Sequence, residues 1–238
     1  DTTSSISTGV WYHIVLTQTS TARKIYVDGV EQTLAVGGGS PQTVAWNSPT
    51  SALRIGHAGA YRDEFDGQMA DARIYSAALS AANVKEIYND SKVILPSNVS
   101  QTNLKCWLPL VDGAGTIAYD GSGNGNDGAL TNMTSADWLT GQTGAPQLVE
   151  GYNRKAVFED STDYVLADNA GITGDISVSA WIYRFSDTLY YAGVVAKMST
   201  SGSGDGWMFR FDSAHQLEFM LQRSGVFSGE GSVTLSNN

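Results

Sequence analysis

Short apolar runs separated by turn residues recur along the whole chain, and each predicts a β-strand. Residues 10–16 are apolar or aromatic on both alternating faces, which is typical of a strand packed on two sides. Asp28 and Gly29, between residues 24–27 and 30–34, favour the positive φ angles of a tight hairpin turn. We expect further strands at residues 52–55, 68–75, 156–158, 164–166, 176–183, 193–197, 207–211, 216–221 and 232–235.

One segment has the spacing of an amphipathic helix. Residues 79–89 carry Val84, Ile87 and Tyr88 at helical intervals, and Ser80 can cap the first turn. Many short strands, a single helix and no alternation of strand with helix predict an all-β fold. We therefore expect a sandwich of two antiparallel sheets with one short helix.

Composition and charge exclude several classes of protein. The 238 residues are enough to bury a large core without covalent cross-links, and the single cysteine, Cys106, excludes an intrachain disulfide and a thiolate zinc site. The net charge is −10, so nucleic acid is not an expected partner. The chain has no apolar run long enough to cross a bilayer, so we expect no membrane insertion.

Two sets of short motifs carry a family resemblance. One set lies at residues 9–17, 25–29, 65–75 and 78–80, and the other at residues 107–116, 119–128, 156–158, 163–165 and 176–182. The first set resembles the closing half of a laminin G-like, concanavalin A-like lectin/glucanase jelly roll. The second set resembles the opening half of the same jelly roll, so the resemblance implies a jelly-roll sandwich.

The two halves occur in inverted order along the chain. Residues 1–95 resemble the closing half, residues 96–103 would be a linker, and residues 104–238 resemble the opening half. Either residues 1–238 form one circularly permuted domain, or the chain is a segment cut from a tandem array. A half jelly roll exposes sheet edges, so the halves need complements within the chain, in flanking repeats or in the next subunit, which would build a filament.

Closure within one chain makes a specific prediction about strand pairing. Under this hypothesis, the strand at residues 11–17 pairs with the C-terminal part of the same chain. We expect its partner near residues 216–221 or 232–235.

A glycine- and asparagine-rich loop at residues 120–128 is a candidate metal site. Its glycines allow a tight curl in which carboxylate and amide oxygens can converge, as calcium requires. In similar domains this loop and an acidic residue of the strand before the helix form a calcium site. The resemblance therefore implies Asp120, Asn124, Asn126 and Asp71 as ligands of calcium as a cofactor. The alternative is a β-turn closed by Asx hydrogen bonds.

The sequence does not predict a catalytic set. Glu64-Phe65-Asp66 superficially resembles the carboxylate dyad of glycoside hydrolases, because alternate strand residues share a face. No second glutamate follows at the required position, since Gly67, Gln68 and Met69 come next. We interpret this segment as a loop that enters a strand, and we assign no catalytic residue.

Aromatic residues near predicted loops are candidate ligand-binding residues. An exposed ring can stack on the apolar face of a sugar or anchor a protein partner. The candidates are Tyr61, Tyr190, Tyr191 and Trp207.

These observations favour a non-enzymatic extracellular module, on a cell surface or a virion surface. It would serve adhesion, carbohydrate recognition or assembly, with a glycan or a surface protein as partner and calcium as a stabilising ion. The first alternative is a glycoside hydrolase that acts on a polysaccharide. The second is a purely structural repeat of a filament or fibre that self-associates through complementary half-domains.

Overall fold

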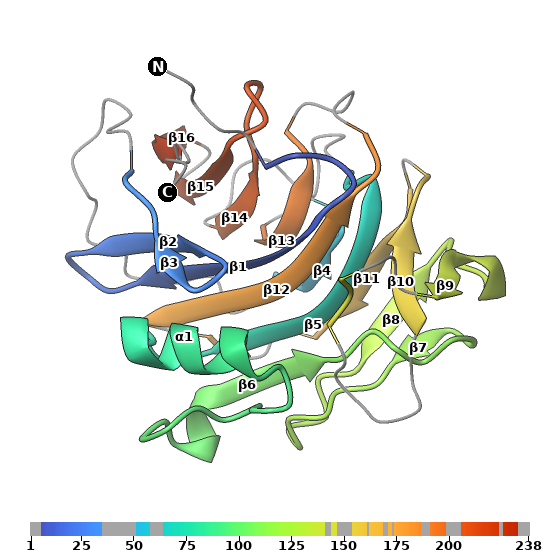
Figure 1. The fold of residues 1–238 in the computed structure, drawn as a ribbon, viewed down its shortest axis with the longest axis horizontal. Helices are drawn as coiled ribbons and strands as arrows, with labels where there is room; N and C mark the ends of the chain where they lie inside the picture. Colours follow the sequence, from blue (N-terminus) through green and yellow to red (C-terminus); the bar gives the residue numbers. More distant parts are fainter. Residues whose placement is uncertain are drawn as a thin grey trace.

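The apolar runs of the sequence fold into two facing sheets (Figure 1). The computed structural model describes residues 6–34, 51–57, 64–140, 144–146, 154–160, 162–168, 171–172, 174–186, 191–198, 206–223 and 226–232. Within these residues each sheet has eight strands, and the two-sheet antiparallel sandwich with one α-helix is as predicted. No helix among them is long and apolar enough to cross a membrane.

The first sheet contains the longest strands. Its order is β3-β2-β1-β12-β5-β10-β9, with β6 pairing the second half of β5. Their bounds are Val30–Glu31 (β3), Arg23–Val27 (β2), Trp11–Gln18 (β1), Ile176–Arg184 (β12), Gly67–Tyr75 (β5), Arg154–Phe158 (β10), Trp138–Thr140 (β9) and Leu104–Leu108 (β6).

The second sheet follows the order β16-β15-β14-β13-β4-β11-β8-β7. It includes four strands, β4, β7, β8 and β11, of two to four residues each. The bounds are Val226–Ser232 (β16), Leu217–Arg223 (β15), Gly206–Phe211 (β14), Gly193–Lys197 (β13), Leu53–Ile55 (β4), Tyr164–Ala167 (β11), Gly128–Thr131 (β8) and Ile117–Ala118 (β7).

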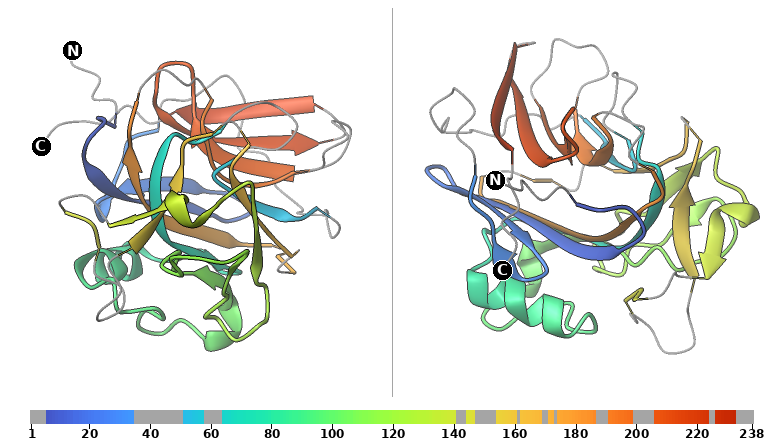
Figure 2. Two further views of the ribbon diagram at one scale, coloured as in Figure 1. Left: turned by 90° about the vertical axis from the view of Figure 1, so that its right-hand side faces the viewer. Right: turned by 45° about the horizontal axis from the view of Figure 1, so that its top comes forward.

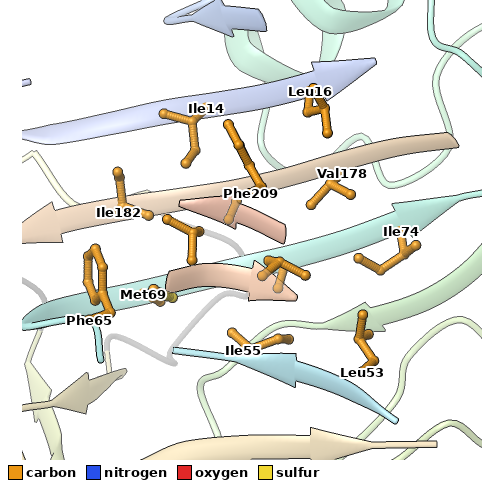
Figure 3. Close-up of a cluster of buried hydrophobic side chains, with 14 of the residues drawn as sticks. Ile14, Leu16, Leu53, Ile55, Phe65, Met69, Ile74, Val178, Ile182 and Phe209 are labelled. Carbon is orange, nitrogen blue, oxygen red and sulfur yellow. The ribbon is translucent and has the colours of Figure 1, made fainter. Parts of the chain in front are cut away.

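One apolar core fills the space between the sheets. Alternate residues of each strand point inward, so Ile14 of β1, Ile182 of β12 and Met69 of β5 meet Phe209 and Ile55 of the second sheet (Figure 3). All five side chains are at most 1% exposed. This burial is the main source of stability in a sandwich of this kind.

The N-terminal and C-terminal parts of the chain interlock in both sheets. β12 lies between β1 and β5, and β4 lies between β13 and β11. The register of β1 with β12 runs from Trp11 opposite Tyr183 to Gln18 opposite Ile176. These pairings support our proposal that residues 1–238 form one domain in permuted order.

The partner of β1 differs from the prediction. β1 does pair with the C-terminal part of the same chain, but with β12 rather than residues 216–221 or 232–235. Residues 217–223 form β15 and pair with β14 and β16 in the other sheet. Residues 233–235 lie outside the described residues. The prediction was wrong because pairing in a two-sheet fold is set by long-range packing rather than by neighbouring sequence.

A helix and the proposed linker cover part of the outer side of the first sheet (Figure 2). The predicted helix is confirmed as Ala81–Asn89 (α1), and Ser80 and Asn83 cap its first turn in a capping box. After α1, residues 91–103 pack with Val93 and Ile94 against the sheet and end in the 3-10 helix Gln101–Asn103. A second 3-10 helix, Ser135–Asp137, precedes β9.

The buried guanidinium of Arg73 holds this cover in place. Arg73 is 0% exposed, and its Nη2 donates to the carbonyl oxygen of Ser91 at 2.7 Å. Its Nη1 donates to the carbonyl of Val93, and the Tyr75 hydroxyl donates to the carbonyl of Ile94 at 2.7 Å. The chain is therefore fastened to the sheet at residues 91–94, just before the segment 96–103 that was expected to be a linker.

A buried histidine joins α1 to the sheet. His13 is 1% exposed, and its Nε2 is 2.9 Å from the hydroxyl oxygen of Ser179 on the neighbouring strand. Its ring lies 5.1 Å from the ring of Trp181 and is stacked 5.9 Å from the ring of Tyr88 on α1. Burial, with a smaller contribution from the charge of Arg73, lowers the pKa of His13 to about 3.

This pKa predicts that mild acid destabilises the fold. Below the unfolded-state pKa of 6.5 the unfolded chain binds a proton at His13 that the folded chain does not. The free energy of unfolding should therefore fall by up to about 1.4 kcal/mol per pH unit as the pH drops from 6.5 towards 3. Urea unfolding of the protein and of a His13→Gln variant over this range measures the effect. Equal pH slopes for the two proteins would contradict it.

Candidate functional site

The outer face of the second sheet presents polar and aromatic side chains away from the core. Leu53 and Ile55 of β4 belong to the core, so Arg54 between them points outward. The same alternation applies along β11, β14 and β15, whereas β13 has a register shift at which both Val194 and Val195 join the core. The residues of this outer face are Arg54, Tyr164, Leu166, Ala196, Met208, Arg210, Glu218 and Met220.

An aromatic ring held by an ion pair marks one side of this face. Arg210 and Glu218 are opposite each other on β14 and β15, and Arg210 Nε lies 2.6 Å from Glu218 Oε1. The guanidinium carbon of Arg210 is 4.4 Å from the ring centroid of Tyr191, which is 40% exposed. Burial raises the pKa of Glu218, and the charge of Arg210 opposes this rise.

Tyr191 has an unusual backbone conformation. Its φ angle is 62°, in the left-handed region that bulky residues rarely adopt. Residues in such conformations are held there by their surroundings and are frequent at ligand-binding sites. The contact with Arg210 is one restraint of this kind.

A second polar group lies across the sheet from Tyr191. The ring of His57 is 5.6 Å from the ring of Tyr164 on β11, and the backbone of His57 forms an isolated bridge with Glu64. Burial and the charge of Arg54 lower the pKa of His57, whereas Glu64 opposes this shift. His57 therefore contacts the ring of Tyr164 and lies near the charges of Arg54 and Glu64.

A row of small and flexible side chains connects the two polar groups. Strand register places Arg54, Ala196, Met208 and Met220 side by side across β4, β13, β14 and β15. Met198 joins Ala196 and the two methionines in a separate apolar cluster. Ala196, Met198 and Met208 are at most 3% exposed, so these side chains are buried and are not open to a ligand.

This arrangement can bind a neutral, hydroxyl-rich ligand. Tyrosine rings stack on the apolar face of a pyranose ring. The guanidinium donors of Arg210 and the carboxylate acceptors of Glu218 can exchange hydrogen bonds with hydroxyl groups. Because these two charges are already paired, the site beside Tyr191 has little net charge.

Of the four predicted ligand-binding residues, Tyr191 lies on the surface. Trp207 is 2% exposed and packs in the core, where its ring is stacked 6.1 Å from that of Phe219. Its ring is therefore not available for stacking on a ligand. Tyr61 and Tyr190 lie outside the described residues.

The carboxylate of Asp120 is enclosed by hydrogen bonds from the chain. Its Oδ1 accepts from the backbone N–H groups of Trp107 and Ser122, both at 2.9 Å. Its Oδ2 accepts from the hydroxyl of Ser122 at 2.8 Å and from the backbone N–H of Asn126 at 2.9 Å. Each oxygen of Asp120 thus already accepts two hydrogen bonds.

The two asparagines of the loop bind it to β6. The side-chain Nδ2 of Asn124 donates to the carbonyl oxygen of Leu104 at 2.7 Å. The Nδ2 of Asn126 donates to the carbonyl oxygen of Lys105, also at 2.7 Å. Both side chains therefore act as donors here, whereas the Asx hydrogen bond of the loop runs from the N–H of Ser122 to Asp120 Oδ1.

Asp71 binds the indole of Trp107, whereas Asp120 binds its backbone N–H. Asp71 is 1% exposed, and its Oδ1 accepts from the indole Nε1 of Trp107 at 2.8 Å and from Arg73 Nε at 2.6 Å. Arg73 Nη2 also lies 2.6 Å from Asp71 Oδ2, so the charge of this carboxylate is matched by a buried guanidinium. Burial raises the pKa of Asp71, and the charge of Arg73 opposes the rise.

In this arrangement the four predicted ligands do not fit a calcium ion. Calcium takes about six to eight oxygen ligands, and those of Asp120 and Asp71 are already hydrogen-bonded or ion-paired. Within the described part of the chain, no group of three or more His, Cys, Asp or Glu side chains could hold a metal.

The glutamate and aspartate of the hydrolase-like motif are separated by their surroundings. Phe65 between them is buried in the core, and Glu64 lies opposite His57. The carboxylate of Asp66 accepts a hydrogen bond from the hydroxyl of Ser186. The backbone of Glu64 thus pairs with His57, whereas the carboxylate of Asp66 is bound by Ser186.

Sequence reasoning did not identify the polar pair Arg210 and Glu218 or the group around His57. The pair spans a hairpin, so its two residues become neighbours only once the register of β14 and β15 is known. The alternation of Trp207, Phe209 and Phe211 did carry a signal, since it indicates a strand with one apolar face and hence an outward Arg210.

The hydrogen-bonded loop predicts that calcium does not control stability. Neither a chelator nor about 10 mM calcium should change the melting temperature, although a site with a dissociation constant of about 0.1 mM would add about 2.7 kcal/mol. Asp120→Ala should destabilise the protein by about 2–4 kcal/mol, because it leaves four donors without an acceptor. A calcium-dependent rise in melting temperature that Asp120→Ala abolishes would contradict this prediction.

Comparison with known proteins finds one family. Residues 1–85 match the model of Laminin_G_3, described as the concanavalin A-like lectin/glucanases superfamily. Neither curated proteins nor solved structures give a match. The matched segment contains β1 to β5 and the start of α1, including the two central strands that pair with β12. Residues 1–85 are thus similar to this superfamily, and they lie within a two-sheet antiparallel sandwich that is consistent with a jelly roll.

Proposed function

We propose that this protein is a non-enzymatic module that binds carbohydrate on the outer face of its second sheet. The matched superfamily includes lectins and glucanases by its description, which favours a carbohydrate ligand. The observation that carries the proposal is the exposed ring of Tyr191, held beside the ion pair of Arg210 and Glu218. A ring for stacking and paired polar groups for hydroxyls are the two features that pyranose recognition needs.

The arrangement of carboxylates favours binding over catalysis. Glycoside hydrolysis uses two carboxyl groups that flank one bond, one as acid and the other as base or nucleophile. On the outer face Glu218 is paired with Arg210, and Glu64 lies opposite His57, which follows β4. Asp66 is bound to Ser186. No two of the carboxylates of Glu218, Glu64 and Asp66 are therefore placed to flank one glycosidic bond.

We further propose that the module acts outside the cell, on a cell or virion surface. The chain carries 24 acidic and 14 basic residues, and charged residues make up only 16% of it. A surface of hydroxyl, amide and glycine groups suits contact with glycans or with surface proteins.

Replacement of Tyr191 tests the site directly. Tyr191→Ala should weaken binding to a polysaccharide that the protein retains by about ten-fold, because it removes the stacking surface and the contact with Arg210. Affinity electrophoresis against a panel of polysaccharides, followed by calorimetry on the best ligand, measures the change.

Tyr119→Ala is the matched control for this variant. Tyr119 is 62% exposed and follows β7, which is separated from β13 by β4, β11 and β8. Its replacement should leave affinity unchanged. Equal effects of the two variants, or no retention of the protein by any polysaccharide, would contradict the proposed site.

The two alternative functions give different outcomes. A glycoside hydrolase would release reducing sugar from a β-glucan and lose this activity in Glu64→Gln. A purely structural repeat would bind no glycan and would instead form concentration-dependent oligomers in analytical ultracentrifugation. Retention of a surface protein without retention of any glycan would favour a protein-binding role.

A further inference from the structure

The outer side of the first sheet contains a buried lysine without a partner. Ala156 and Phe158 of β10 point into the core, so Lys155 points to the opposite side. Lys155 is 0% exposed, and its Nζ has no hydrogen-bond partner among the described residues. Burial lowers the pKa of this amine, and the charge of Asp71 partly opposes the shift.

Two indole groups in the same region also lack acceptors. Trp11 is 5% exposed, and it forms a cluster with Ala70 that Trp181 and Val111 join. The Nε1 atoms of Trp11 and Trp181 are buried and have no hydrogen-bond partner in the described part of the chain. Buried polar groups normally find a partner, so each such donor needs an explanation.

The strand register gathers these three donors around one small residue. Trp181 of β12 is opposite Ala70 of β5. On the other edge of β5, Ala156 is opposite Met69, which places Lys155 next to Ala70. Trp11 packs on Ala70 directly. Lys155, Trp11 and Trp181 are therefore neighbours of Ala70 on the outer side of the first sheet.

All three groups are hydrogen-bond donors. An ammonium and an indole N–H can donate hydrogen bonds, but neither can accept one. The amine of Lys155 shares the single carboxylate of Asp71 with the guanidinium of Arg73, so two cations here face one anion. A bridging water would bring two hydrogens that need acceptors, whereas an anion would supply only acceptors.

The backbone beside Ala70 is also held in a strained conformation. Asp71 and Leu110 both have φ angles of 57°, and the N–H of Asp71 donates to the carbonyl of Pro109 at 3.0 Å. Non-glycine residues rarely adopt the left-handed region, and here two of them lie on neighbouring segments of the chain. Such strain is found at ligand clamps.

We propose that the first sheet has an anion site at Ala70, which binds a single carboxylate group through Lys155 and the indole N–H groups of Trp11 and Trp181. A carboxylate has two oxygens with about four acceptor positions, so it can satisfy all three donors and balance the charge of the amine. The site is separate from the proposed carbohydrate face, because it lies on the opposite sheet.

Titration with sodium formate tests this site, with tryptophan fluorescence as the readout. The wild-type protein should show a saturable change, because formate would bind both indole N–H groups. Lys155→Met keeps the length of the side chain and removes the charge, and should weaken formate binding at least ten-fold. Lys85→Met, which removes an exposed lysine on α1, should bind formate as the wild type does. Circular dichroism confirms that each variant is folded.

The source of the carboxylate is distinguished by parallel titrations with acetate and glucuronate. Saturation by formate and acetate alone indicates a site for free small acids, whereas saturation by glucuronate as well indicates a site for sugar acids. Trp181→Phe removes one donor and should weaken formate binding several-fold.

Three results would overturn the proposal. These are no saturable response to any of the three carboxylates, an equal response in Lys155→Met, and a response to chloride that the carboxylates do not reproduce. Loss of polysaccharide binding in Tyr191→Ala has no bearing on these titrations, so the two sites succeed or fail independently.

Discussion

Strand β12 depends on the N-terminal part of the chain for both of its neighbours. Its nine residues form backbone hydrogen bonds with β1 on one side and β5 on the other. Without residues 1–95 this buried strand would lose both ladders, and its N–H and C=O groups would lack partners. In the second sheet, the loss of β4 would likewise leave β13 and β11 without the strand that joins them. We therefore regard the two parts of the chain as complements of one sandwich.

This interlocking also determines which surfaces remain for binding. The outer side of the first sheet is partly covered by α1 and by residues 91–94, which Arg73 and Tyr75 fasten to it. The outer face of the second sheet presents Tyr191, Arg210 and Glu218. The two sheets thus have different roles: the first carries the structural and buried charged groups, and the second carries the candidate ligand face.

Local patterns predicted the elements that depend on few neighbours. The hairpin turn at Asp28 and Gly29 is confirmed by φ angles of 50° and 76°, and the helix after β5 begins at its predicted cap. Strands β7, β8 and β9 were not predicted, and their two to four residues are too few to show a period. Strand β16 was predicted at residues 232–235 but is formed by Val226–Ser232.

Local sequence patterns could not predict the features that depend on contacts between distant residues. The partner of β1 lies more than 150 residues away, as the pairing of Trp11 with Tyr183 illustrates. The left-handed conformation of Asp71 follows from its contacts with Trp107 and Pro109, which no motif encodes. For the same reason the resemblance placed Asp71 in a metal site, whereas its carboxylate is ion-paired with Arg73.

Native-state hydrogen exchange tests most directly whether the two parts form one cooperative unit. If they do, the amides of β1, β5 and β12 will exchange with the same opening free energy and respond alike to low concentrations of denaturant. Amides of β12 that stay protected under conditions in which those of β1 and β5 exchange freely would show that residues 104–238 are stable alone. That result would contradict a single interlocked domain.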